Sequence, residues 1–169
     1  MAKYRLPEDV KLTALSYVKG YPRRKAEYMV KFNDIVAGKG FPFETYTING
    51  YDERGDPCEL ECRVPIDRVF GSIGNPTQQK AFLLEKLSRH PETVRMRAVE
   101  KAMELIGDRI MNDDLRKKLV QAIMLNCDSG RVYIYEEMEL PGISRKAFFA
   151  ERRRFLWYVA KYSDLLWEE

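Results

Sequence analysis

Apolar residues recur every three or four positions along most of the chain, which is the spacing of an amphipathic α-helix. Residues 7–20 and 22–38 each carry such a stripe and each end at a glycine. Residues 1–40 are therefore predicted to form an N-terminal helical hairpin. The stripe of its second helix consists of Met29, Phe32, Ile35 and Val36.

Residues 74–169 contain three further helical patterns, a short apolar and acidic segment (VYIYEEMEL), a PGI turn and a last helix. The last helix is expected to begin at Ser144 and to end near Tyr162. A helix, a short helix, a tight turn and a longer basic helix form the order that a helix-turn-helix DNA reader needs. We predict a helical domain over 74–169, with the helix-turn-helix at about 114–162.

The pattern changes between residues 41 and 73, where glycine, proline and aspartate accumulate. The sequence CELECRV, residues 58–64, alternates apolar with charged positions, which is typical of a short half-buried strand. This segment is predicted to be an irregular or β-like insertion, with a small β-hairpin as one option. The fold class is thus mainly α, a helical bundle with a C-terminal helix-turn-helix.

Composition argues against a disordered, a membrane-spanning or a disulfide-rich protein, but it does not identify a function. A length of 169 residues suits one domain or a small domain with an appendage, and 45% hydrophobic residues exclude wholesale disorder. A net charge of +3 is too small to indicate nucleic acid by itself, so local clustering must decide. No apolar run is long enough for a membrane helix, and three cysteines do not make a disulfide framework. We expect a cytoplasmic protein with no membrane partner.

The strongest local cluster is SRKAFFAERRRF, which begins at Ser144. On a helical projection Phe148, Phe155 and Val159 share one face, and most basic residues share the opposite face. Ser144 would cap the helix and place its first backbone N–H groups against a phosphate. The candidate DNA-binding residues are Ser144, Arg145, Lys146, Arg153, Arg154 and Lys161.

Arg152 projects toward the apolar side, where a guanidinium needs a counter-charge. We expect a structural ion pair between Arg152 and Glu136 or Glu137 of the short helix. The alternative for the helix as a whole is a solvated basic face on an ordinary core helix, and spacing alone does not decide between the two.

A second basic cluster, Arg23, Arg24 and Lys25, opens the second helix. Cations at the positive end of a helix suit a phosphate or an acidic partner. A solvated first helical turn is the simpler alternative.

No pattern indicates catalysis, a cofactor or a metal, and we expect none of the three. A zinc site is disfavoured because its ligands would be loosely spaced, with no second close pair. His90 directly precedes a proline and fits the end of a helix better than a metal site. The candidate zinc ligands are Cys58, Cys62, His90 and Cys127, and the acids that a nuclease metal would need are Asp52, Asp56, Glu59 and Glu61.

Several segments resemble the RinA/ArpU-like late-gene transcription activators of Gram-positive phages and prophages. These are YPRRKAEY, GNPTQQKAFLLEKLSRH, AVEKAMELIGD, LRKKLVQAIMLN and ISRKAFFAERRRFLWYVAKY. The most specific is the serine-started helix with its arginine run and FLWYVA. The resemblance implies packing positions at Phe148, Phe155 and Val159, and recognition-helix positions at Ser144, Arg145, Lys146, Arg152, Arg153 and Arg154.

This resemblance implies a phage or prophage transcription regulator that binds double-stranded DNA in the cytoplasm of the bacterial host. A homodimer is expected because paired half-sites multiply specificity, and host RNA polymerase or another host protein is a further candidate partner. The alternative is a phage-encoded inhibitor or adaptor of a host nucleic-acid-binding protein. Its surfaces would be the 41–73 insertion and the acids at 136–139 and 168–169.

Overall fold

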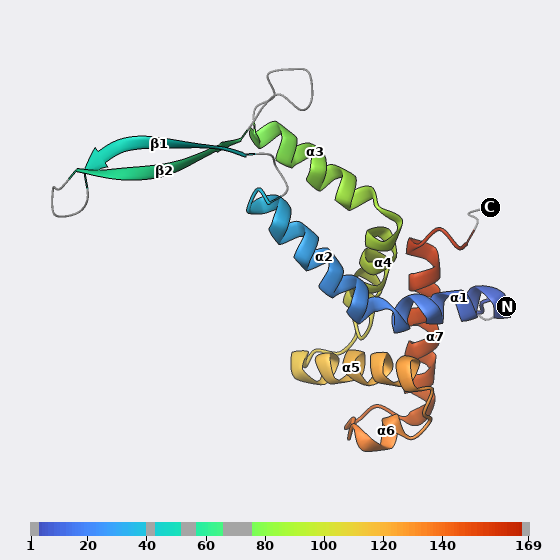
Figure 1. Cartoon of the computed structure of the whole chain (residues 1–169). Helices are drawn as coiled ribbons and strands as arrows, with labels where there is room; N and C mark the ends of the chain where they lie inside the picture. The colour runs from blue at the N-terminus through green and yellow to red at the C-terminus, as the bar shows by residue number, and fades with distance from the viewer. Residues whose placement is uncertain (1–3, 40–42, 52–56, 66–75, 167–169) are drawn as a thin grey trace. The chain divides into compact units, whose positions relative to one another are not determined.

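The computed structural model describes residues 4–39, 43–51, 57–65 and 76–166, which form seven helices and one two-stranded sheet (Figure 1). The predicted mainly α fold is confirmed. The helices are α1 (Glu8–Lys19), α2 (Tyr21–Val36), α3 (Pro76–Arg89), α4 (Pro91–Leu105), α5 (Asp113–Ser129), α6 (Ile134–Glu137) and α7 (Arg145–Tyr162), and the strands are β1 (Phe43–Tyr51) and β2 (Pro57–Pro65).

The chain divides into two compact units. The first combines Met1–Glu27 with Arg89–Glu169, and the second is Tyr28–Ser88, so one boundary falls inside α2. The segment boundaries expected from the sequence, near residues 40 and 73, stay predictions.

The core of the first unit surrounds α7. This helix packs against α4, α1 and α5, and one of its sides is fully buried. The buried residues of α7 are Phe148, Phe155, Leu156, Val159 and Ala160. The largest residues that the other helices contribute to the same core are Val18, Val99, Leu119 and Ile123. The apolar face that the sequence assigned to the last helix is therefore the face that holds it in the bundle.

Side-chain caps explain where three of these helices begin. The Ser144 hydroxyl accepts a hydrogen bond from the Ala147 backbone N–H at 3.2 Å, as predicted. Asn112 accepts the equivalent hydrogen bond at the start of α5, and the His90 ring does so at the start of α4. His90 is thus a helix-end residue, as expected.

The second unit carries an antiparallel hairpin. Strands β1 and β2 pair from Phe43 opposite Pro65 to Tyr51 opposite Pro57. The strand predicted from CELECRV is present, and the hairpin left as an option is observed.

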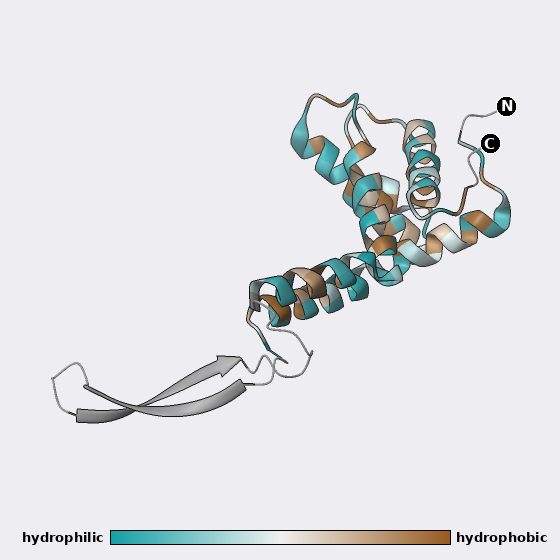
Figure 2. Cartoon of the chain, turned by 90° about the horizontal axis from the view of Figure 1, so that it is seen from above, coloured by the Kyte–Doolittle hydropathy of each residue, from teal (hydrophilic) through white to brown (hydrophobic). Residues whose placement is uncertain are grey.

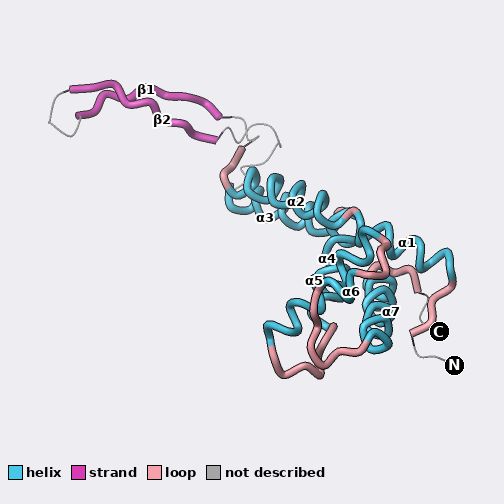
Figure 3. Tube along the Cα trace, turned by 90° about the horizontal axis from the view of Figure 1, so that it is seen from below, coloured by secondary structure: helices cyan, strands magenta, loops and turns pink. Residues whose placement is uncertain are grey.

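The helices of the second unit leave apolar side chains in solvent. Figures 1 and 3 show α2 and α3 side by side, and the Lys80 ammonium donates a hydrogen bond to the Val36 carbonyl at 2.8 Å. Hydrophobic positions recur along both helices (Figure 2), and the side chains of Val30 and Phe82 remain 61% and 65% exposed. The apolar stripe expected on α2 is therefore only partly covered, since Met29 and Val36 are exposed as well.

None of the described helices combines the length and the apolar character that a bilayer crossing requires.

The position of Leu119 at the centre of the core leads to a stability prediction. Leu119→Ala should lower the free energy of unfolding by about 2–5 kcal/mol, because it leaves a cavity at a fully buried site. The matched control on the same helix is Leu125→Ala, where the leucine is 42% exposed and the expected change is within about 0.5 kcal/mol. Urea unfolding of both variants measures the difference, and equal losses would contradict the assigned core.

Candidate nucleic-acid interface

The start of α7 is fixed by the short segment before it. Ile134 and Leu140 are buried, and the Tyr135 hydroxyl donates a hydrogen bond to the Ile143 carbonyl at 2.8 Å. The Tyr135 ring also lies 5.6 Å from the ring of Phe148. Gly142 has φ 76°, a left-handed conformation that glycine adopts without strain. The turn therefore sets the direction in which the first turn of α7 leaves the bundle.

An exposed strip runs along α7 opposite its buried side. It consists of Lys146, Ala147, Ala150 and Arg153, and all four residues are exposed. Ala150 lies four residues after Lys146, three after Ala147 and three before Arg153, so all four residues share one helix face. Two cations flank two methyl side chains, so the helix backbone can approach a partner closely between them.

Arg145 stands beside this strip and has a weak partner inside the chain. Its guanidinium lies 3.3 Å from a carboxylate oxygen of Glu136 and 6.0 Å from the centroid of the Phe149 ring. Both charged side chains are about half exposed, and exposed pairs of this kind contribute little to stability. Arg145 can therefore exchange Glu136 for a phosphate.

Arg154 faces the protein rather than solvent, which corrects the orientation expected from the helical projection. It binds both carboxylate oxygens of Asp108, at 2.8 and 2.9 Å, and its side chain is only 13% exposed. Glu151, which lies 3.5 Å from Arg154, accepts a hydrogen bond from the Gly107 backbone N–H. These contacts fasten α7 to the loop after α4, so Arg154 acts as a structural residue.

The bond to Arg154 also holds Asp108 in its charged form. The hydrogen bonds from that guanidinium lower the pKa of Asp108 from 3.8 to about 2, against the smaller opposing effect of burial. The same pairing raises the pKa of Arg154 above its ordinary value. The pair is therefore ionised at any physiological pH.

Arg152 lacks the ion pair that the sequence suggested. Within the described part of the chain Glu136 pairs with Arg145, and the buried Nε of Arg152 has no hydrogen-bond partner. The Cys127 thiol lies nearby, but burial raises its pKa to about 11, so it stays neutral and offers no counter-charge. The predicted bracing of α7 by Arg152 with Glu136 or Glu137 is therefore not what the structure displays.

Lys161 and Ser144 mark the two ends of α7. Lys161 is exposed, and its ammonium lies 5.6 Å from the Trp157 ring centroid. It lies about four helical turns after Lys146, the first residue of the exposed strip. Ser144 is occupied by its capping bond, but the other N–H groups of the first helical turn need acceptors from outside the helix. An anion can supply those acceptors.

The second basic cluster is neutralised within the chain. Arg24 binds Glu92 and donates a hydrogen bond to the Tyr17 carbonyl at 2.9 Å, and Lys25 binds Glu100. The hydrogen bond from Arg24 lowers the pKa of Glu92. Arg23 lies 3.0 Å from Glu27. This cluster ties α2 to α4 and leaves little free charge for a phosphate or an acidic partner.

The candidate metal ligands do not gather among the described side chains, where no three His, Cys, Asp or Glu residues lie together. His90 serves as a helix cap and Cys127 is buried. Asp52 and Asp56 lie outside the described residues, as do the side chains of the four candidates on β2, namely Cys58, Glu59, Glu61 and Cys62.

The sequence did not predict two residues of this region, Asp108 and Arg5. Asp108 pairs with a residue 46 positions later, and no local pattern marks such a partner. Arg5 lies in the segment before α1, whose neighbour Tyr4 packs edge-on against Trp157 with ring centroids 5.4 Å apart. Arg5 lines the same pocket as Arg152 and Arg153 of α7, and a lone arginine ahead of a helix gave no reason to expect it.

Comparison with known proteins adds no relative: no protein-family model, curated protein or solved structure matches this chain.

The pair of Asp108 with Arg154 predicts a pH dependence. Because the pKa of Asp108 falls from 3.8 to about 2 on folding, its stabilising contribution is full above pH 3.8 and disappears as the pH drops toward 2. Asp108→Asn should therefore cost about 1 kcal/mol or less near neutral pH, since Asp108 is half exposed and screened by solvent. The difference from the wild type should shrink across that acidic window.

Urea unfolding at a series of pH values measures this difference. The control is Asp128→Asn, an exposed carboxylate that has no ion pair among the described residues. A difference between wild type and Asp108→Asn that grows on acidification would contradict the assigned pair.

Proposed function

We propose that this protein is a DNA-binding transcription regulator that places the first half of α7 in the major groove of duplex DNA. The observation that carries the proposal is the exposed strip of Lys146, Ala147, Ala150 and Arg153 on a helix whose other side is locked in a core. A helix fits the width of the major groove, and a rigid helix loses little freedom on binding.

The chemistry of the strip suits this role. Within the described residues neither Lys146 nor Arg153 has a carboxylate partner, so both cations are available to phosphates or base edges. Arginine can bind guanine through two parallel hydrogen bonds, and exposed alanine methyl groups can contact the methyl group of thymine. Arg145 adds a cation that its exposed pairing with Glu136 does not immobilise.

The sequence resemblance supplies the biological context of the proposal. If the RinA/ArpU-like pattern reflects ancestry, the regulator belongs to a phage or prophage and works in the bacterial cytoplasm. Homodimerisation, or contact with host RNA polymerase, would use the exposed apolar side chains of α2 and α3, among them Val30 and Phe82.

The same exposed side chains also favour the second candidate, an inhibitor or adaptor that binds a host protein. Its proposed acidic surface is weaker support, because Glu136 already contacts Arg145 and residues 168–169 lie outside the described part of the chain. DNA binding therefore remains the preferred function.

The variant Lys146→Ala/Arg153→Ala tests the proposal. Its affinity for duplex fragments of the genome that encodes this chain should fall by about 10- to 100-fold, and the slope of log K against log salt should flatten by about 2. Both residues are exposed, so thermal unfolding should be unchanged. Fluorescence anisotropy over a salt series measures the affinity and the slope together.

Lys118→Ala is the matched control, since Lys118 is exposed on α5, outside the strip. Arg154 is unsuitable for this test, because its loss would weaken the attachment of α7 to the loop at Asp108. Unchanged duplex binding by the double variant would overturn the role of α7, and a tight host-protein complex without any duplex affinity would favour the adaptor.

A further inference from the structure

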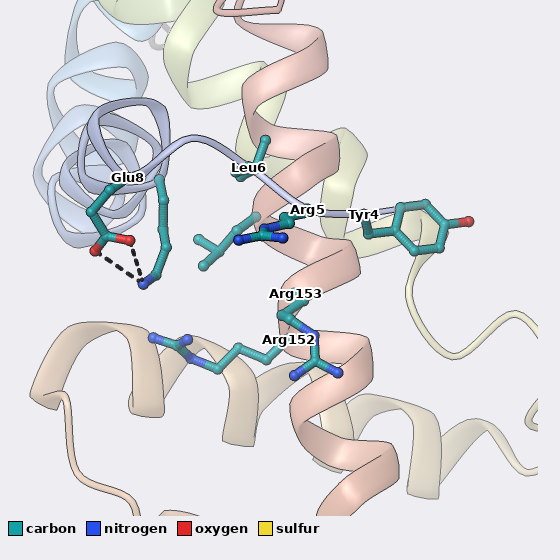
Figure 4. Close-up of a pocket in the computed structure, with 8 residues that line it drawn as sticks. Tyr4, Arg5, Leu6, Glu8, Arg152 and Arg153 are labelled. Atoms are coloured by element: carbon teal, nitrogen blue, oxygen red, sulfur yellow. Dashed lines mark hydrogen bonds and ion pairs between the residues drawn. The ribbon is translucent and has the colours of Figure 1, made fainter. Parts of the chain in front are cut away.

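A small pocket opens between the N-terminal segment and the middle of α7 (Figure 4). Its volume is about 200 Å³. The residues around it come from the segment before α1, the first turns of α1 and two turns of α7. They are Tyr4, Arg5, Leu6, Glu8, Lys11, Arg152, Arg153 and Leu156.

The pocket has a strong excess of positive charge. Four cations and one carboxylate line it, and the carboxylate of Glu8 is already bound by Lys11 at 3.1 Å. Arg5 and Arg153 have no carboxylate partner within the described residues. Figure 4 shows Arg5 on the N-terminal segment that crosses α7, with Arg152 and Arg153 at adjacent positions of the helix, and all three residues line the pocket.

Arg152 gives the pocket an uncompensated charge. It is half-buried, its Nε is fully buried without a hydrogen-bond partner, and the neutral Cys127 thiol cannot balance it. A buried charge without a counter-ion is costly, and buried polar atoms are normally satisfied. An anion in the pocket would lower this cost, whereas a neutral or cationic ligand would not.

We infer that this pocket binds a phosphate group between Arg5, Arg152 and Arg153. The planar guanidinium donates paired hydrogen bonds that match the oxygens of a phosphate. Three guanidinium groups around one pocket can bind several oxygens of the same tetrahedral anion at once. Leu156 and the Leu6 side chain supply apolar walls, which strengthen charge interactions by excluding water.

The phosphate has two sources, a phosphodiester of the DNA backbone or a free phosphate ligand. Arg153 belongs both to this pocket and to the exposed strip of α7, so a duplex lying on the strip would bring its backbone to the pocket. The assignment to DNA rests on the function proposed above. On this assignment Arg5 binds a phosphate of the DNA backbone, while Lys146 and the rest of the exposed strip contact the major groove.

Titration with inorganic phosphate at constant ionic strength tests the pocket without any DNA. In spectra of the arginine Nε–Hε groups, we expect a saturable shift for Arg152 in the wild type and in the control Lys118→Gln. Arg5→Gln should weaken phosphate binding by about tenfold, since one charge-assisted hydrogen bond is lost at an exposed residue that the fold does not need.

A second variant separates binding from stability. Arg152→Met should abolish the saturable shift of the remaining pocket arginines while the protein stays folded, because it removes an unpaired half-buried charge. Absence of a saturable shift in the wild type, or equal shifts in the wild type and Arg5→Gln, would overturn the phosphate site.

Competition with duplex DNA identifies the source. If the pocket holds a backbone phosphate, saturating duplex should displace inorganic phosphate, and Arg5→Gln should reduce the salt slope of duplex binding by about 1. If inorganic phosphate still binds to the duplex complex, the pocket stands and its assignment to the backbone falls. If the wild type binds no duplex, the function proposed above fails while the phosphate titration still decides the pocket.

Discussion

Burial of one side of α7 is the constraint on which the rest of the first unit depends. Phe148, Phe155 and Val159 are almost completely removed from solvent among α1, α4 and α5, and removal of apolar area from water is the main driving force of folding. Once this side is fixed, the helix cannot rotate. The exposure of Lys146 and Arg153 on the other side follows from that packing. The proposed recognition surface and the core are thus two sides of one helix.

Four arginines among the described residues illustrate two contrasting kinds of surroundings. Arg24 and Arg154 are mostly buried and are bound by carboxylates from distant parts of the sequence, so they fix α2 and α7 to their neighbours. Arg5 and Arg153 are exposed without such partners among the described residues. Since a paired cation has little affinity left for a phosphate, the internal carboxylates determine which basic residues remain available.

The sequence predicted the helices well because their causes are local. Apolar spacing, the caps His90 and Ser144 and the glycine stops act within a few residues, and the alternation of CELECRV likewise predicted a strand. The roles of Arg154 and Arg152 were not predictable in the same way. Each depends on where an unrelated segment lies, namely Asp108 for the first and the N-terminal segment for the second.

The first unit is made from both ends of the described chain, and this affects the order in which it can form during synthesis. Val18 and Val159 belong to one core, yet the whole of Tyr28–Ser88 lies between them in sequence. On the ribosome α1 emerges well before α7, so its apolar side is not fully covered until α7 has been synthesised. The second unit has no such delay, so the inserted segment can fold while the surrounding unit is still incomplete.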